Sequence, residues 1–215
     1  MCRAGPRFGI DHDSLRCSAE NRARRLSNTL MSGFPKTLVL ACHPQTLCAA
    51  VRRVAATLWK SNSGALGLTY ALEGDLARLR IPLQGPARRG DKLWQHACFE
   101  VFIGVAGSKE YHEFNFAPSG EWAAYAFRRY RVGAPLAQAV DPHILVRAGE
   151  HRLELDAVVP FLSLPTAKPH ERLRVGISAV VEDETGLLSY WALRHPPGRP
   201  DFHHPDAFAL ELEPF

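Results

Sequence analysis

The stretch that decides the fold runs from residue 98 to residue 127 and reads CFEVFIGVAGSKEYHEFNFAPSGEWAAYAF. In its first part, apolar side chains at 99, 101 and 103 alternate with a second set at 98, 100 and 102, a period of two that is typical of a β-strand. Two further alternating segments, Tyr111–Phe116 and Glu121–Phe127, flank Ala117-Pro118-Ser119-Gly120. Proline presets one turn dihedral and glycine permits a positive one, so these segments predict a hairpin.

Similar short alternating segments recur along the rest of the chain, separated by clusters of turn-forming residues, and helical periodicity is weak throughout. Two more hairpins are expected, one joining 144–147 to 153–158 and one joining 173–181 to 187–193. Further strands are expected at 65–72, from 79 to 81 and at 207–212. The sequence therefore predicts an all-β fold, an antiparallel β-sandwich of the immunoglobulin-like or jelly-roll type with about ten strands.

Composition and charge narrow the classes of protein to consider. The chain has 215 residues, 46% of them hydrophobic, which is ordinary for one globular domain. The first 30 residues account for +3 of the net charge of +4, so the remainder is almost neutral and does not predict a nucleic-acid partner.

No apolar run in the sequence is long enough for a membrane helix, so no membrane partner is predicted. Five cysteines without a CxxC pair predict no disulfide framework, and a cytoplasmic location is expected.

The chain divides into two parts at its second methionine. Residues 1–30 form an Arg-rich head without apolar periodicity, which we expect to be disordered and to lie upstream of a second start at Met31. Residues 31–215 are expected to form the single β-sandwich domain.

Standard catalytic signatures are missing from the sequence. There is no GxSxG elbow, Walker loop or GxGxxG. His112-Glu113 begins an HExxH zinc motif, but position 116 is Phe and the segment reads as a strand. We therefore predict no catalytic residues and no cofactor.

One face of the predicted sheet combines aromatic rings with carboxylates, an amide and hydroxyls. This composition suits a ligand with many hydroxyl groups, because rings cover the apolar C–H face of a sugar while polar groups bond its hydroxyls. The alternative interpretation is that loops cover the rings and that arginines pair with the carboxylates. Alternation places nine residues on this predicted binding face: Trp94, His96, Glu100, Tyr111, Glu113, Asn115, Ser178, Ser189 and Trp191.

A proline-rich segment near the C-terminus, residues 194–206, predicts a long ordered loop. Its side chains include donors that suit a divalent metal, although their spacing matches no known zinc pattern. Histidines that stabilise the loop through backbone hydrogen bonds are the alternative. The four candidate metal ligands are His195, Asp201, His203 and His204.

Three blocks of the sequence, DKLWQHACFEVFIG (91–104), YHEFNFAPSGEWAAYAFRRYR (111–131) and ISAVVEDETGLLSYWALRHPPGRPDFHHPDAFAL (177–210), resemble the bacterial DOMON-like domain proteins, which are related to the family 9 carbohydrate-binding modules. The resemblance runs from about residue 37 to residue 212. It implies a β-sandwich that binds a sugar or a haem on one sheet without catalysing a reaction. The Trp-x5-Glu element of such modules falls on Trp94 and Glu100, and the following strand falls on Tyr111, Glu113 and Asn115.

Three functions follow as hypotheses. The first is a binding module for a saccharide or sugar-like metabolite, with Trp94 and Trp191 stacking on the ligand and Glu100, Glu113, Asn115 and His96 bonding its hydroxyls. The second is a metal-dependent hydrolase or isomerase that uses the four loop ligands, with Glu182 or Glu100 as general base. The third is haem binding. The resemblance implies iron ligation by Met and His side chains of the sandwich, but the only methionines, Met1 and Met31, precede the predicted sandwich, which leaves ligation by two histidines as the open alternative. The sequence leaves the identity of the ligand and the oligomeric state open.

Overall fold

The computed structural model describes residues 32–60, 65–136, 141–160 and 171–213, so the predicted disordered head and both methionines lie outside the described residues. Within the described residues, every regular element longer than three residues is a β-strand, and the prediction of an all-β fold is confirmed. No helix in this part of the chain is long and apolar enough to cross a membrane.

The strands, in chain order, are β1 (Ser32–Cys42), β2 (Val51–Lys60), β3 (Ala65–Gly74), β4 (Arg88–Arg89), β5 (Cys98–Val105), β6 (Tyr111–Phe116), β7 (Glu121–Arg129), β8 (Val132–Pro135), β9 (His143–Ala148), β10 (Arg152–Pro160), β11 (Leu173–Glu182), β12 (Leu188–Ala192) and β13 (Leu210–Leu212). Short 3-10 turns lie at η1 (Leu76–Arg78), η2 (Leu93–Gln95) and η4 (Pro205–Ala207).

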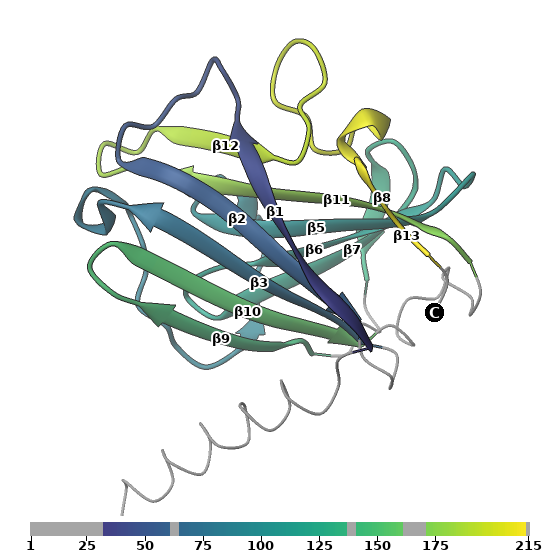
Figure 1. Cartoon of the computed structure of the whole chain (residues 1–215), viewed down its shortest axis with the longest axis horizontal. Helices are drawn as coiled ribbons and strands as arrows, with labels where there is room; N and C mark the ends of the chain where they lie inside the picture. Colours follow the sequence, from purple (N-terminus) through teal and green to yellow (C-terminus); the bar gives the residue numbers. More distant parts are fainter. Residues whose placement is uncertain (1–31, 61–64, 137–140, 161–170, 214–215) are drawn as a thin grey trace, which may run out of the picture.

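The described strands form one connected sheet of 13 strands in the order β4-β7-β6-β5-β11-β12-β1-β2-β3-β10-β9, with β13 beside β11 and β8 beside β7. Strand β1 makes the connection, because residues 36–40 pair with β2 whereas Ala41 and Cys42 pair with β12. Figure 1 shows the sheet curled so that β2, β3, β10 and β9 lie in front of β11, β5, β6 and β7. The finer prediction, a sandwich of about ten strands, is therefore replaced by a curled sheet of 13 strands that is continuous through β1.

The two halves of this sheet share one hydrophobic core. From β3 the core receives Leu68 and Tyr70, and from β5 it receives Phe99 and Val101. The Tyr70 hydroxyl donates a hydrogen bond of 2.7 Å to the backbone carbonyl of Glu100, and its ring centroid lies 5.0 Å from that of Phe99. The alternation predicted for β5 is thus confirmed. The even-numbered side chains of β5, including Glu100, point to the opposite face, which we call the outer face.

The three predicted hairpins are present as β6–β7, β9–β10 and β11–β12. Gly120, in the turn between β6 and β7, has a φ of +88°, a conformation that side-chain-bearing residues rarely adopt. A Cβ atom at Gly120 would also lie 2.9 Å from the carbonyl oxygen of Gly85. This turn fixes the register of the two strands that carry much of the outer-face chemistry.

Candidate functional site

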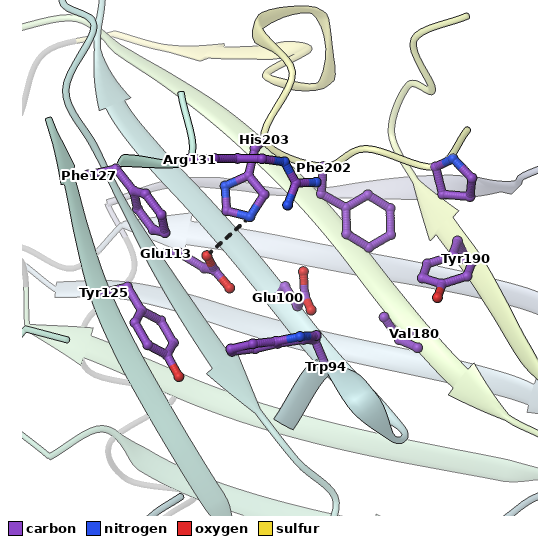
Figure 2. A pocket seen from close by; sticks show the side chains of 11 residues that line it. Trp94, Glu100, Glu113, Tyr125, Phe127, Arg131, Val180, Tyr190, Phe202 and His203 are labelled. Carbon is purple, nitrogen blue, oxygen red and sulfur yellow. Dashed lines mark ion pairs between the residues drawn. The ribbon is translucent and has the colours of Figure 1, made fainter. Parts of the chain in front are cut away.

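A pocket of about 320 Å³ opens on the outer face of the half-sheet formed by β5, β6, β7, β11 and β12. Figure 2 shows two carboxyl groups at its centre, with aromatic rings around them and a histidine and an arginine on one side. We call it the outer pocket. Its lining residues are Trp94, Glu100, Glu113, Tyr125, Phe127, Arg131, Val180, Tyr190, Pro200, Phe202 and His203.

The two carboxyl groups, Glu100 and Glu113, come from neighbouring antiparallel strands. Glu100 pairs with Asn115 and Glu113 pairs with Phe102 in the β5–β6 ladder, so the two glutamates are diagonal neighbours on one face. The Asn115 amide donates to Glu113 at 2.8 Å, and the Ser178 hydroxyl donates to Glu100 at 3.4 Å. These contacts hold both carboxyl groups in place.

Burial governs the protonation of this carboxyl pair. Glu100 and Glu113 are only 2% and 4% exposed. Desolvation raises the pKa of Glu100 well above its usual range, with repulsion from Glu113 adding to it, and desolvation raises the pKa of Glu113 to about 7. In the free protein at neutral pH, the pair therefore holds a proton that exposed glutamates would release.

His203 lies next to the carboxyl pair and is held by Tyr111. The Tyr111 hydroxyl accepts the backbone N–H of Arg131 at 3.1 Å and lies 3.0 Å from Nδ1 of His203. If the hydroxyl donates its proton to Nδ1, a neutral imidazole carries its own proton on Nε2. This Nε2 lies 3.7 Å from a carboxyl oxygen of Glu113. Burial, helped by the Arg131 charge, lowers the pKa of His203 to about 4, so the ring is neutral at pH 7.

Arg131 reaches the same side of the pocket from the turn between β7 and β8. It donates to Asp201 at 2.8 Å and to the Tyr130 hydroxyl at 3.3 Å, while Tyr130 donates to Asp201 at 2.7 Å. Arg131 and Lys92, just before the η2 turn that carries Trp94, both have a φ of +54°. In the described chain they are the only non-glycine residues with positive φ, and such backbone strain is concentrated at functional sites.

Aromatic rings enclose the carboxyl pair on several sides (Figure 2). Trp94 is 39% exposed and packs edge-on against Tyr125 at 5.7 Å between centroids. On another side, Tyr190 lies 6.0 Å from Phe202. The arrangement therefore offers ring faces, a hydrogen-bonded carboxyl pair and neutral and cationic donors within one hollow.

Part of the predicted binding face converges on this pocket. Trp94, Glu100 and Glu113 line the pocket. Asn115 and Ser178 do not line it, but they donate hydrogen bonds to the two carboxyl groups. Tyr111 does not line the pocket, but it positions His203 through its hydroxyl.

The prediction for β12 was wrong. Trp191 pairs with Ala179 and belongs to the main core at 6% exposure, and its indole N–H donates to the Ser189 hydroxyl at 3.0 Å. The predicted alternation puts Ser189 and Trp191 on the outer face, whereas both side chains point inward. In a strand, a shift of one residue moves every side chain to the other face. Tyr190, which lies between Ser189 and Trp191, faces the outer pocket instead.

His96 also lies outside the outer pocket. Its Nδ1 lies 2.7 Å from Glu182, which accepts a second bond from Arg80 at 2.9 Å. These three residues line a second hollow, which shares no lining residue with the outer pocket. The prediction that His96 shares a hollow with Glu100 was therefore wrong.

The four predicted metal ligands do not lie together at one site. His195 bonds the backbone carbonyl of Ala41, Asp201 binds Arg131, His203 faces Glu113, and His204 accepts the backbone N–H of Asp206. Among the residues that the structure describes, no group of three or more His, Cys, Asp or Glu side chains is placed to hold a metal ion.

Seven lining residues were missed by the sequence reasoning: Tyr125, Phe127, Arg131, Val180, Tyr190, Pro200 and Phe202. Alternation along β7 and the opposite phase on β12 would have found Tyr125, Phe127 and Tyr190. Arg131, Pro200 and Phe202 come from turns and loops without periodicity, so no sequence pattern points to them.

Comparison with known proteins places the fold. No protein-family model matches the chain, and no curated protein matches it. A candidate carbohydrate-binding protein from Bacteroides uniformis superposes with a TM-score of 0.56 at 15% identity, covering 96% of this chain and 92% of that one. A family 9 carbohydrate-binding module from Caldicellulosiruptor kristjanssonii, solved with cellotriose, superposes with a TM-score of 0.50 at 7% identity, covering 76% and 75%. The chain thus has the fold found in these carbohydrate-binding proteins.

Proposed function

We propose that this chain is a non-catalytic module that binds a saccharide in the outer pocket. The observation that carries the proposal is the enclosure of two fixed carboxyl groups by rings from separate strands and loops (Figure 2). The fold supports it, because the two similar structures are described as carbohydrate-binding and one of them holds cellotriose.

Each group in the outer pocket has a part in this function. The exposed face of Trp94 and the ring of Tyr190 pack on the C–H faces of a sugar. The carboxyl pair, Nε2–H of His203 and the Arg131 guanidinium bond its hydroxyls. Because Glu100, Glu113 and Tyr190 sit on paired strands, these groups need little ordering when the ligand binds. Stacking contributes about 0.5–1.5 kcal/mol per ring beyond area burial, so we expect dissociation constants between micromolar and millimolar.

The proposal is tested by isothermal titration calorimetry of the whole chain against common hexoses, amino sugars, cellotriose and peptidoglycan fragments. We expect saturable binding of at least one of them, with the saccharide recovered unchanged. Tyr190→Ala should weaken binding about tenfold, whereas Leu187→Ala, which changes a 71% exposed residue outside the pocket, should leave the affinity unchanged. No binding across the panel, or equal affinity of the Tyr190→Ala variant, would overturn the proposal.

A further inference from the structure

The charge balance of the outer pocket is incomplete. Glu100 and Glu113 are buried at its centre, yet in the described part of the chain Glu100 forms no ion pair, and the histidine that faces Glu113 at 3.7 Å, His203, is neutral. Arg131 lines the same pocket and its charge lowers the pKa of both glutamates, against the larger effect of burial, but its guanidinium is bound by Asp201 and Tyr130 and by neither glutamate. A buried carboxylate without a cation is unfavourable, so a cationic ligand would be favoured here.

The rings around the carboxyl pair favour the same kind of ligand. Trp94, Tyr125, Phe127, Tyr190 and Phe202 line the pocket on different sides (Figure 2). Faces of Trp, Tyr and Phe attract cations through their quadrupoles, and the attraction is stronger where water is excluded. Rings enclosing paired carboxyl groups are the chemistry that recognises an ammonium group.

We propose that the saccharide bound by this chain carries a free primary amine, and that its ammonium group binds at the carboxyl pair of Glu100 and Glu113. This inference rests on the proposed function, and it narrows the ligand class to amino sugars with an unblocked amine. Acetylation would remove the charge and add bulk, so N-acetylated sugars are expected to bind more weakly.

Binding of an ammonium group is coupled to proton release. Because desolvation raises the pKa of both glutamates, the free pocket holds a proton that a bound cation would displace. The other titratable or charged groups around the pair keep their state near neutral pH. His203 stays neutral, Arg131 and Asp201 stay paired, and burial raises the pKa values of Tyr111, Tyr125 and Tyr190.

The test compares glucosamine, galactosamine and mannosamine with their parent hexoses and N-acetyl derivatives, by calorimetry of the whole chain at pH 6.5. We expect at least one free amino sugar to bind ten times more tightly than its hexose. Repeating the titration in buffers of different ionisation enthalpy should show release of protons with the amine and none with the hexose.

Neutral substitutions test the role of the carboxyl pair. Glu113→Gln should reduce the ratio of amine affinity to hexose affinity, both measured on the same variant, to about twofold or less, and Glu100→Gln provides the same test if the first variant does not fold. Glu150→Gln, which makes the same change of charge at an exposed position outside the pocket, should keep the full preference.

The outcomes separate this inference from the proposed function. Equal affinity for an amino sugar and its hexose, or binding of the amine without proton release, overturns the inference and leaves saccharide binding intact. Absence of binding by any sugar overturns both.

Discussion

Two tryptophans, Trp94 and Trp191, have different roles in the molecule. Trp94 sits on a 3-10 turn with 39% of its surface exposed at the outer pocket, whereas Trp191 is 6% exposed in the main core. Both are rings that sequence reasoning assigned to ligand stacking. Only their burial distinguishes a binding ring from a structural one.

We therefore expect substitutions of the two rings to have different effects. Trp94→Ala should weaken saccharide binding about tenfold, with less than about 1 kcal/mol lost from the free energy of unfolding. Trp191→Ala should lower the free energy of unfolding by about 3–5 kcal/mol, because it empties a packed core site. Calorimetry and urea denaturation of both variants check this. Loss of stability in Trp94→Ala equal to that in Trp191→Ala would contradict it.

The carboxyl pair makes stability depend on pH. Folding raises the pKa of Glu113 from its ordinary 4.5 to about 7, so the folded state holds a proton that the unfolded chain has released. This contribution to stability is present below about pH 4.5 and is lost as the pH rises to about 7. His203, whose pKa folding lowers to about 4, gives the opposite trend between about pH 4 and 6.5.

Comparison of Glu113→Gln with the original chain removes the titration of Glu113 and keeps His203 in both proteins. The variant should gain roughly 1–3 kcal/mol in relative free energy of unfolding between pH 5 and pH 8. Urea denaturation at these two pH values measures the difference. A difference that does not change with pH would show that Glu113 titrates normally.

At the scale of elements, the C-terminal loop completes a site that the strands begin. Asp201 accepts bonds from Tyr130, from Arg131 and from the backbone N–H of His203, which ties the loop to the β7–β8 turn. Phe202 and His203, which directly follow Asp201, line the pocket. Asp201 therefore helps to position the part of the loop that lines the pocket, together with the bond between Tyr111 and His203.

Asp201→Ala should loosen this loop and weaken saccharide binding several-fold, with about 1–2 kcal/mol lost from the free energy of unfolding. Amide hydrogen exchange over residues 199–204 should become faster. Asp206→Ala in the same loop lies outside the pocket and should leave both exchange and affinity unchanged. Equal effects of the two substitutions would show that Asp201 does not anchor the loop.

The strands also show which parts of the site alternation in the sequence can predict. Alternation predicted the faces of β5 and β6, hence Glu100 and Glu113, and Gly120 marked the β6–β7 turn. The same logic failed on β12, where Ser189, Tyr190 and Trp191 give no clear apolar phase and packing against β11 decides it. Loop residues have no period, so their contribution required the folded chain.

At the scale of the whole molecule, one core joins both halves of the curled sheet. The strand β1 pairs with β2 along most of its length and with β12 at its end, and Tyr70 of β3 bonds the backbone of β5. Sequence patterns give strand order along the chain but not which strands pair at a distance, so this closure was not predicted. A shared core implies that the described strands unfold together.

Ligand binding should consequently stabilise the entire sheet. A saccharide at one hundred times its dissociation constant is expected to add about 2.7 kcal/mol to the free energy of unfolding. Circular dichroism and tryptophan fluorescence should report one common transition that moves to higher temperature with ligand. Two separate transitions, with only one moved by ligand, would contradict a single cooperative unit.

The central claim is that a saccharide binds in the outer pocket. Its most direct test is to follow the four tryptophan indole N–H groups by nuclear magnetic resonance while a saccharide that binds the chain is titrated in. Trp94 lines the outer pocket, Trp122 and Trp191 lie in the core, and Trp59 packs over Gly67 on the other half-sheet. We predict that the Trp94 resonance shifts and saturates while the resonances of Trp59, Trp122 and Trp191 stay in place. A saturable shift that spares Trp94 and moves another indole would contradict the assignment of the binding site.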